Sequence, residues 1–357
     1  MTVELNQPLS FAHGPTWPNR FALAPLTNMQ SHQDGTLGED EYKWLTARAR
    51  GGFAMTMTCA AYVHRSGRAW HGQLGISGDE HLEGLTRLAS GIRAAGSFSI
   101  VQLHHGGRRA LGDEGPRLAP WSSEDDNTRS LTSSEVGDVI EWFVSAAQRA
   151  QEVGFDGVQL HGAHGYLLGQ FLDGRNNQRE DDWGGSFDNR RRIILEIVDR
   201  VRNATGPEFH LGVRLTPEGA GITIPEAQEL ATALMTSGKI DHLDMSLWDV
   251  FQSPGPTGTR ELLIDEFTSL PRGATRLGVA GKILSASDAA WCLERGADFV
   301  TVGTAGIIHA DFPVRVLADP EFESIPQPVT AEYLKSQELG PEFIEYLSTN
   351  WDDFVRG

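Results

Sequence analysis

Residues 209–246 read FHLGVRLTPEGAGITIPEAQELATALMTSGKIDHLDMS. The two ends of this stretch, 209–215 and 241–246, are short apolar runs of the kind found in strands buried on both faces. Residues 225–237, between them, carry apolar side chains at helical spacing. The stretch therefore predicts a strand, a helix and a second strand that runs parallel to the first.

The same alternation continues on both sides of this unit. Further strands are predicted at 20–26, 53–58, 98–104, 155–161, 276–280 and 298–303. Further helices are predicted at 39–50, 79–95, 134–153, 188–204 and 286–296, with a last one near 312–318. Eight strands that alternate with helices indicate an α/β protein whose parallel sheet closes into a (β/α)8 TIM barrel. An open, doubly wound sheet is the alternative.

Several of the predicted helices begin with a hydroxyl residue followed three positions later by an acid. The pairs are Ser77 with Glu80, Thr132 with Glu135, Thr223 with Glu226, and Ser285 with Asp288. At a helix start the hydroxyl accepts a hydrogen bond from an unpaired N–H, and the acid complements the helix dipole. We therefore interpret all four pairs as helix starts.

Two connections are long, 105–133 and 162–187. Both follow strands at the end of a barrel where active sites are built, so we expect them to form a lid over that face. No repeat, linker or charge run divides the chain. We expect a single domain over 1–357, with a lead-in at 1–18 and a C-terminal extension from about 320.

Composition excludes several classes of protein. The 357 residues include 30 Lys and Arg against 48 Asp and Glu, so the net charge of −18 argues against a nucleic-acid partner. Cys59 and Cys292 are too few for a disulfide framework, a thiolate zinc site or an iron–sulfur cluster. The N-terminus lacks a signal-peptide pattern, and no stretch is apolar enough to span a membrane. We expect a cytoplasmic protein.

Polar residues gather where the predicted strands end. Gln102 and His104 share one face of their strand by the two-residue period, as do Gln159 and His161. Arg214 ends another strand. We expect these side chains to converge, although each is also consistent with a polar residue satisfied within the core. His161 and His164 form an H-x-x-H pair with no third ligand, so no metal site is predicted.

Small-residue turns follow the last two predicted strands. Gly281 and Lys282 follow the seventh strand, and Gly303 and Thr304 follow the eighth. Backbone N–H groups at these turns form the phosphate site of many barrels, which indicates a phosphorylated cofactor. Two ordinary glycine turns are the alternative.

The sequence from about Asn19 to Pro313 resembles the old yellow enzyme family of FMN-dependent ene-reductases. The most specific block is 158–195, VQLHGAHGYLLGQFLDGRNNQREDDWGGSFDNRRRIIL, which is similar to the histidine-containing substrate loop of the family and its Gly-Gly-Ser and Asn-Arg pattern. Supporting blocks are NRFALAPLTNMQ at 19–30, QLHHGGR at 102–108 and GVRLTPEG at 212–219. The lack of a cysteine cluster resembles the short, single-domain branch.

The resemblance implies non-covalent FMN with NADPH or NADH as reductant. It places Thr27 against the flavin C4 carbonyl and N5, Gln102 at the pyrimidine edge and Arg214 near N1 and O2. A guanidinium there would stabilise the negative charge of the reduced flavin. The remaining cofactor contacts that it implies are Pro25, Leu26, Ala60, Gly281, Lys282, Gly303 and Thr304.

The resemblance also implies a substrate site. His161 and His164 would hold a carbonyl or nitro oxygen, Tyr166 would donate a proton to the α-carbon, and His104 and Asn28 would line the pocket. The implied activity is the ping-pong reduction of activated alkenes, with a small-molecule alkene and a nicotinamide nucleotide as partners. A flavin amine dehydrogenase or demethylase, and a barrel that binds flavin without catalysis, are the alternatives.

Four positions differ from the commonest family pattern, namely Thr304, His104, Trp183 and Gln159, and the changes at Trp183 and Gln159 are interpreted as structural. Thr304 stands where an arginine often binds the phosphate, so Lys282 or backbone groups would compensate. His104 stands where some relatives have a tryptophan. Arg356 resembles a terminal arginine that in some relatives reaches a neighbouring subunit, which would imply a homo-oligomer, and a loose tail is the alternative.

Overall fold

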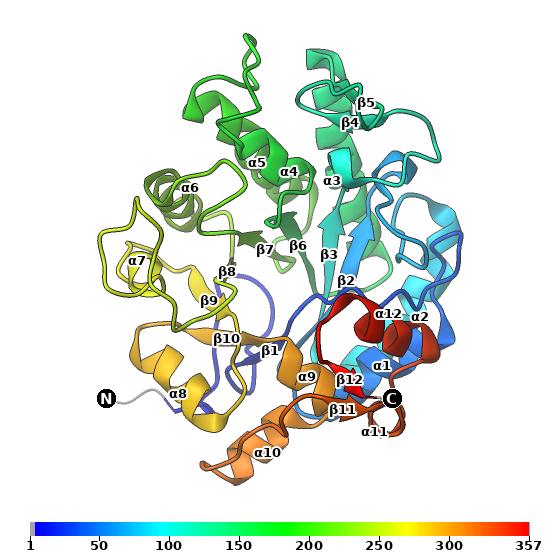
Figure 1. Cartoon of the computed structure of the whole chain (residues 1–357), viewed down its shortest axis with the longest axis vertical. Helices are drawn as coiled ribbons and strands as arrows, with labels where there is room; N and C mark the ends of the chain where they lie inside the picture. The colour runs from blue at the N-terminus through cyan, green and yellow to red at the C-terminus, as the bar shows by residue number, and fades with distance from the viewer. Residues whose placement is uncertain (1–3, 357) are drawn as a thin grey trace.

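The computed structural model describes residues 4–356 and contains a closed barrel of parallel strands (Figure 1). Its strands are β1 (Phe21–Leu23), β2 (Met55–Tyr62), β3 (Phe98–His104), β6 (Gly157–Gly162), β7 (His210–Leu215), β8 (His242–Ser246), β9 (Arg276–Ala280) and β10 (Phe299–Val302). The order around the barrel is β1-β10-β9-β8-β7-β6-β3-β2, and β2 pairs with β1 to close it. The predicted barrel is therefore confirmed, and an open sheet is excluded.

Helices alternate with these strands and surround the barrel. They are α1 (Glu39–Arg50), α2 (Leu82–Ala94), α3 (Ser133–Glu152), α5 (Phe187–Ala204), α6 (Ile224–Thr236), α7 (Asp265–Thr268), α8 (Ala286–Glu294), α9 (Thr304–Ile308) and α10 (Phe312–Ala318). All the predicted helices are present. No helix is predicted after the sixth strand, where the structure has α7, a helix of only four residues.

Three of the four predicted helix starts are correct. Thr132 and Thr223 form complete capping boxes on α3 and α6, and the Ser285 hydroxyl accepts from the Asp288 N–H at the start of α8. The prediction for Ser77 is wrong. A short 3-10 turn, η2 (Asp79–His81), precedes α2, so Ser77 lies too far from the helix to cap it, and its hydroxyl lies 3.3 Å from His81 Nε2.

The lead-in closes the N-terminal end of the barrel. Trp17 is fully buried, and its ring lies 5.1 Å from that of Phe299 in β10. Phe98 from β3 and Met57 from β2 join the same apolar cluster. Aromatic and aliphatic side chains thus fill most of this end of the barrel, and the polar rings of His210 and His242 pack against Trp17 among them.

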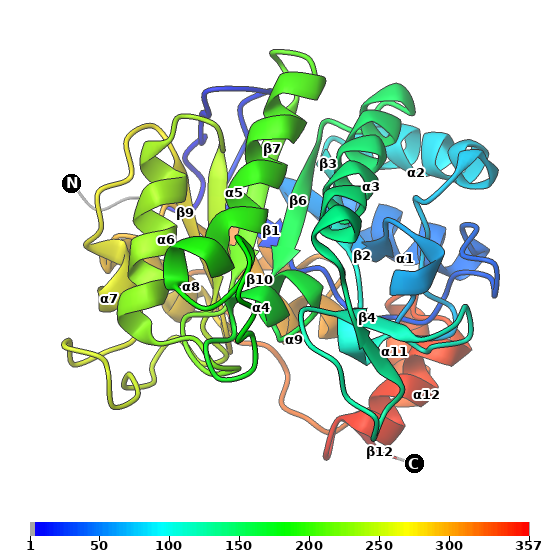
Figure 2. The same cartoon turned by 90° about the horizontal axis from the view of Figure 1, so that it is seen from above.

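The long connections lie at the C-terminal end of the strands. The first contains a 3-10 turn, η3 (Gly107–Arg109), and a two-stranded parallel sheet of β4 (Arg117–Ala119) and β5 (Thr128–Ser130). The second contains α4 (Leu167–Leu172). Figure 2 shows β4 and α4 on the side to which β6 points. These segments occupy the position expected of the lid.

The C-terminal extension consists of β11 (Val329–Thr330), α11 (Ala331–Ser336), α12 (Pro341–Asn350) and β12 (Val355–Arg356). It packs on α1, where the rings of Trp44 and Phe343 meet edge to face at 5.1 Å. β12 pairs with β11 and places Arg356 in regular structure, exposed to solvent. The structure therefore does not show a loose tail.

None of the helices described over 4–356 is both long enough and apolar enough to cross a bilayer.

Candidate active site

Three imidazoles and a phenol meet at the C-terminal end of β3 and β6. The Tyr166 ring lies 4.4 Å from the His104 ring and 5.2 Å from the His161 ring, measured between centroids. His161 lies 5.1 Å from His164. The structure therefore brings together the predicted substrate-binding pair, the predicted proton donor and the pocket residue His104.

A left-handed turn after β6 creates this arrangement. His164 and Gly165 have φ values of 59° and 67°, which reverse the chain as it leaves the strand. The His164 N–H donates to Thr216 Oγ1 at 2.8 Å, and its carbonyl accepts from Arg109 Nη1 at 2.7 Å. The turn is thus held from two sides, and Tyr166 is directed back over the strand ends.

Two residues that were not predicted complete this cluster. The Arg109 guanidinium carbon lies 4.4 Å from the centre of the Tyr166 ring, a cation–π contact. The Trp70 ring lies 5.5 Å from the His104 ring and 6.4 Å from the Tyr166 ring. Both come from connections without a repeating pattern, so only the basic pair Arg108 and Arg109 after QLHHGG gave any signal.

The imidazoles of the cluster are neutral. Burial lowers the pKa of His164 to about 3, with help from the Arg214 and Arg109 guanidinium groups. Burial also lowers the pKa of His161 well below its usual value. The Ala163 N–H donates to His161 Nδ1 at 3.3 Å, so the single proton of this neutral ring lies on Nε2. His161 is therefore an uncharged N–H donor.

Buried neutral histidines make the fold sensitive to acid. The pKa values of His105, His164 and His210 are each lowered to about 3 by burial. In the unfolded chain these groups titrate near 6.5, so unfolding takes up protons below that pH. Stability is fully present above pH 6.5 and falls with acid by about 1.4 kcal/mol per pH unit for each histidine, or about 4 kcal/mol per unit for the three.

We therefore expect the thermal unfolding midpoint to be constant from pH 8 to 7 and to fall steeply from pH 6.5 to 5. Circular dichroism melts over this range, in one buffer mixture of fixed ionic strength, provide the measurement. A midpoint that stays constant down to pH 5 would contradict the neutral, buried state of these imidazoles.

Gln102 lies on β3 and Arg214 on β7, and β6 stands between these two strands. The Gln102 side chain is buried, and its Nε2 donates to Gln159 Oε1 at 2.8 Å. Its Oε1 is buried without a partner among the described residues. Arg214 Nε lies 3.1 Å from Asp244 Oδ2, and burial raises the pKa of Asp244 against the effect of this guanidinium. Asp244, which was not predicted, thus fixes the arginine.

Ser246 connects His164 with Arg214. Its Oγ lies 2.8 Å from His164 Nε2 and accepts from Arg214 Nη2 at 3.4 Å. Ser246 ends β8, on the same face of that strand as Asp244. The position of His164 therefore depends on the same network that holds Arg214.

The segment after β1 provides the next wall. Pro25, Leu26 and Thr27 are half-buried directly beyond β1. The Asn28 side chain, by contrast, is fully buried and bonded to Glu41 Oε1 at 3.2 Å and to the Gln30 N–H at 3.0 Å. These contacts hold the loop together, so we do not carry Asn28 forward as a substrate contact.

Ala60 lies next to Gln102. The two residues are partners in the register of β2 and β3, and the Ala60 carbonyl accepts from Gln73 Nε2 at 2.7 Å. The same Gln73 nitrogen lies 3.1 Å from His104 Nδ1. Gln73, which was not predicted, therefore links the wall of the site to the pocket histidine.

The glycine turns are where the sequence predicts them, one residue after β9 and one after β10. At Gly281 a Cβ would lie 2.6 Å from the Trp248 carbonyl carbon, so this position requires glycine for packing. Lys282 is exposed and pairs with Asp249 at 3.1 Å. At Gly303 a Cβ would make ordinary van der Waals contact with Leu26 and Ala24, and Thr304 begins α9.

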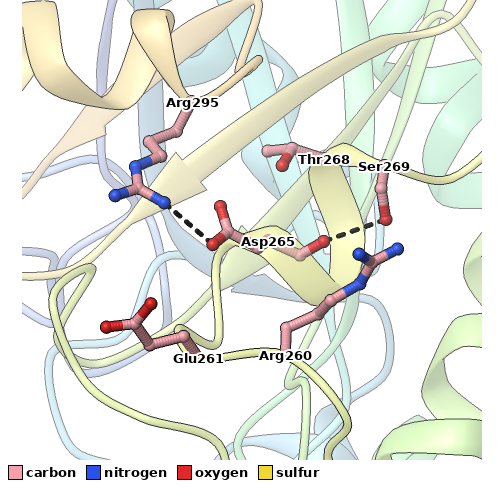
Figure 3. Close-up of a pocket in the computed structure, with 6 residues that line it drawn as sticks. All are labelled: Arg260, Glu261, Asp265, Thr268, Ser269 and Arg295. Carbon is pink, nitrogen blue, oxygen red and sulfur yellow. Dashed lines mark hydrogen bonds and ion pairs between the residues drawn. The ribbon is translucent and has the colours of Figure 1, made fainter.

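Two pockets differ in their relation to this cluster. One of about 330 Å³ is lined by Arg109, Gly165 and Gln170, directly beside Tyr166. Another, of about 450 Å³, lies on α7 and the end of α8 (Figure 3). There Arg295 pairs with Asp265 at 2.9 Å, and Ser269 Oγ donates to the Asp265 carbonyl. The second pocket is thus a surface hollow beside a local ion pair.

Residues 4–321 match the NADH:flavin oxidoreductase / NADH oxidase family. The chain belongs to this family. Its solved relatives include old yellow enzymes, which confirms the resemblance given above. It is an NAD(P)H-dependent flavin oxidoreductase of the old yellow enzyme type, with FMN as cofactor and a nicotinamide nucleotide as reductant.

Similar curated proteins share moderate identity with the chain. A probable NADH-dependent flavin oxidoreductase of Bacillus subtilis is 36% identical over 329 residues, which is 87% of each chain. An NADPH dehydrogenase of the same organism is 29% identical over 89% of this chain and 95% of its own. An NADH:fumarate oxidoreductase of Klebsiella pneumoniae is 32% identical over 89% of this chain, but only 36% of its own length.

Solved structures show the same fold. An old yellow enzyme homologue from Zymomonas mobilis is similar with a TM-score of 0.80 and 25% identity, over 93% of this chain and 96% of its own. Morphinone reductase is similar with a TM-score of 0.79 and 26% identity, over 97% of this chain and 96% of its own.

The residues at the mouth of the barrel fit FMN. The unpartnered Gln102 Oε1 is a buried acceptor directed at this end, as an N–H of a pyrimidine ring requires. Arg214, on β7, is a cation paired with Asp244, and β6 lies between β7 and the strand of Gln102. The turn at Gly303 is not crowded, since a Cβ there would come no nearer than 3.8 Å to Leu26. A planar ring with an amide edge and an anionic tail matches this set.

Proposed function

We propose that this protein is an ene-reductase, which uses NAD(P)H to reduce the activated C=C bond of α,β-unsaturated carbonyl or nitro compounds in a ping-pong cycle. The observation that carries the proposal is the cluster of two neutral imidazoles and a half-buried phenol, in which the His161 ring lies 5.1 Å from that of His164 and 5.2 Å from that of Tyr166. When bound, FMN accepts hydride from the nicotinamide and delivers it to the acceptor.

The imidazoles bind the oxygen of the acceptor. His161 carries an N–H at Nε2, and His164 lies beside it, with its own Nε2 2.8 Å from Ser246 Oγ. An oxygen bound here gains negative charge as hydride reaches the β-carbon. Fixed donors in a site shielded from water stabilise that charge without rearranging, so they lower the barrier of this step.

Tyr166 donates the proton that completes the reduction at the α-carbon. Burial raises its pKa, and the Arg109 guanidinium partly opposes this. The phenol is therefore protonated at neutral pH, while the cation over its ring stabilises the phenolate left after transfer. The phenol thus acts as an acid only toward a strongly basic carbon.

The predicted cofactor contacts are kept as part of this proposal. Gln102, Arg214 and Thr27 would bind the flavin ring, together with Pro25, Leu26 and Ala60. Backbone groups at Gly281 and Gly303, with Thr304, would bind the phosphate. Because Lys282 is exposed and already paired with Asp249, we assign it the smallest share of that binding.

An additional proposal concerns assembly. Arg356 is exposed at the end of β12, whose pairing with β11 holds it in place. A fixed, exposed arginine suits a contact with the site of a second copy, which would make the protein a homo-oligomer. Sedimentation of the wild-type protein beside Arg356→Ala would test this contact.

The flavin absorbance tests the proposed reaction. We expect the purified holoprotein to be yellow, to bleach under anaerobic NADH or NADPH, and to regain its colour when an enone is added. The enone provides the electron acceptor, so recovery in the absence of oxygen measures its reduction directly. Bleaching without recovery on enones, enals, maleimides or nitroalkenes would favour an amine dehydrogenase, and no bleaching would favour a flavin-binding barrel without catalysis.

A further inference from the structure

A continuous chain of hydrogen bonds crosses the inside of the barrel. Gln102 Nε2 donates to Gln159 Oε1 at 2.8 Å, and Gln159 Nε2 lies 2.9 Å from His242 Nε2. His242 Nδ1 lies 2.7 Å from His210 Nε2, and His210 Nδ1 lies 3.3 Å from the His13 carbonyl. The chain thus connects the pyrimidine-binding end of the barrel with the lead-in at its base.

The base of the chain determines its direction. The His13 carbonyl can only accept, so His210 Nδ1 must carry the proton and its Nε2 must accept. His242 Nδ1 must then donate, which leaves His242 Nε2 to accept from Gln159. Burial lowers the pKa of His210 to about 3 and that of His242 well below its usual value, so each ring carries one proton.

The direction of the hydrogen bonds at His242 also determines those of Gln159 and Gln102. Because Gln159 presents its amide nitrogen to His242, its oxygen faces Gln102, which must donate through Nε2. The Gln102 oxygen is then the atom left over, and it is the buried acceptor without a partner described above. A flipped Gln102 amide would require every member of the chain to reverse, and the His13 carbonyl cannot.

His13 is itself fixed. Its backbone N–H and its Nδ1 both bond to Asp241 Oδ1, at 2.9 and 2.8 Å. Arg202 holds the other oxygen of that carboxylate at 2.8 Å. The carbonyl that sets the direction therefore cannot turn away from His210 without breaking this anchor.

Gly212 makes the space for the His242 ring. A Cβ at Gly212 would lie 2.0 Å from His242 Cε1, whereas a Cβ at Gly157 would meet the backbone and Cβ of His210 and not its ring. The rings of Phe98 and Trp17 enclose His210 at 5.0 and 6.2 Å between centroids. The barrel has thus given up side-chain volume at one inward position, Gly212, to enclose the ring of His242, where aliphatic residues are usual.

We propose that His210 and His242 are positioning residues that fix the amide of Gln102, so that its oxygen accepts the N3–H of the flavin. This inference rests on the proposed placement of the pyrimidine edge against Gln102. With the amide reversed, two donors would face each other across a buried contact, which is unfavourable. The geometry therefore assigns His210 and His242, at the base of the barrel, a part in the recognition of the oxidised flavin at its other end.

The test measures the N3–H group directly. Apoprotein is reconstituted with FMN labelled with nitrogen-15 at N3, and the N3–H resonance is recorded by proton–nitrogen NMR. We expect one downfield, slowly exchanging signal in the wild type. In His242→Phe we expect this signal to move upfield and to exchange faster, and the FMN dissociation constant to rise about tenfold, as for the loss of one buried hydrogen bond. His242→Gln, which keeps an acceptor and a donor, should restore much of both.

Controls separate this effect from damage to the core. Phe98→Leu alters the packing against the same His210 ring but removes no member of the chain, so it should leave the N3–H signal in place. His210→Phe frees His242 to reverse its proton, so it should reproduce His242→Phe and replaces it if that variant does not fold. Unchanged N3–H signals in both histidine variants would overturn the proposal.

Gln102→Leu tests the placement of the pyrimidine edge separately from the positioning role of the histidines. If this variant binds FMN as the wild type does, with the same N3–H signal, the pyrimidine edge is not placed against Gln102 and the proposed cofactor site is wrong. If Gln102→Leu loses the signal while His242→Phe and His210→Phe keep it, the placement holds and the positioning role of the histidines is wrong.

Discussion

Replacing Tyr166 with phenylalanine is expected to slow the reduction of an enone by about a hundredfold or more, while the reduction of the flavin by NAD(P)H stays near its wild-type rate. General acid catalysis by a positioned side chain contributes on the order of 10²–10⁴. The variant keeps the ring that packs on His104 and lies under Arg109. It removes the phenol oxygen that we propose as the source of the proton.

Anaerobic stopped-flow absorbance at the flavin band separates the two halves of the cycle. The reductive half is followed after mixing with the nicotinamide, and the oxidative half after mixing the reduced protein with 2-cyclohexenone. Tyr333→Phe is the matched control, because the Tyr333 hydroxyl lies 3.2 Å from His309 Nδ1 on the C-terminal extension, outside the site. Equal slowing of both halves in the Tyr166 variant would show that the phenol is not the proton donor.

The fold and the list of residues at the barrel mouth were predictable because both follow from short periods. The two-residue period of a strand and the position of its last residue place Gln102, His104, His161 and Arg214 at one end of the barrel, and the structure confirms that they lie there. The capping pairs at Thr132 and Thr223 depend only on a spacing of three, and both are present.

Features that depend on the path of a loop were not predictable. Arg109 and Trp70 lie in connections without periodicity, and their approach to Tyr166 is set by turns that have no sequence pattern. The prediction for Ser77 was wrong for the same reason, because a 3-10 turn intervenes between the hydroxyl and α2. Asn28 resembled a pocket residue, but Glu41, thirteen positions later, holds its amide in the core.

The hydrogen-bonded chain of Gln102, Gln159, His242 and His210 has a sequence pattern, but apolar residues surround it and make it hard to recognise. In β7 the two-residue period puts His210, Gly212 and Arg214 on one face, and in β8 it puts His242 and Asp244 on one face. A histidine followed two positions later by glycine on an inward face indicates that a neighbouring side chain needs the missing volume. Only the register, which pairs Gly212 with His242, shows which one.

The second large effect is expected at His161 and His164, the pair proposed to bind the oxygen of the acceptor. His161→Ala should lower kcat/KM for enones by about 10²–10³, the usual cost of removing one donor to a developing oxyanion. The loss should appear in the oxidative half of the cycle, because the donor acts on the charge that forms as hydride arrives. His161→Gln retains an N–H group and should recover part of the rate, whereas a residue that only fills space would show no such recovery.

His105→Gln is the control for the loss of a buried histidine. His105 follows His104 directly, but its ring stacks near Trp142 and its Nδ1 accepts from the Gly107 N–H at 3.0 Å, away from the cluster. We expect this variant to keep its activity on enones. A loss equal to that of His161→Ala would mean that the effect arises from the folding of this end of the barrel.

The pH dependence decides between a neutral and a charged donor at His161. Its pKa is lowered well below the usual value by burial first and then by His164 and Arg214, so the ring gains no proton as the pH falls from 8 to 6. The rate of enone reduction should therefore be constant over this range in the wild type. A rate that rises toward acid with a midpoint near 6.5 would show that an imidazolium binds the oxygen, and the assignment of a fixed, uncharged donor would be wrong.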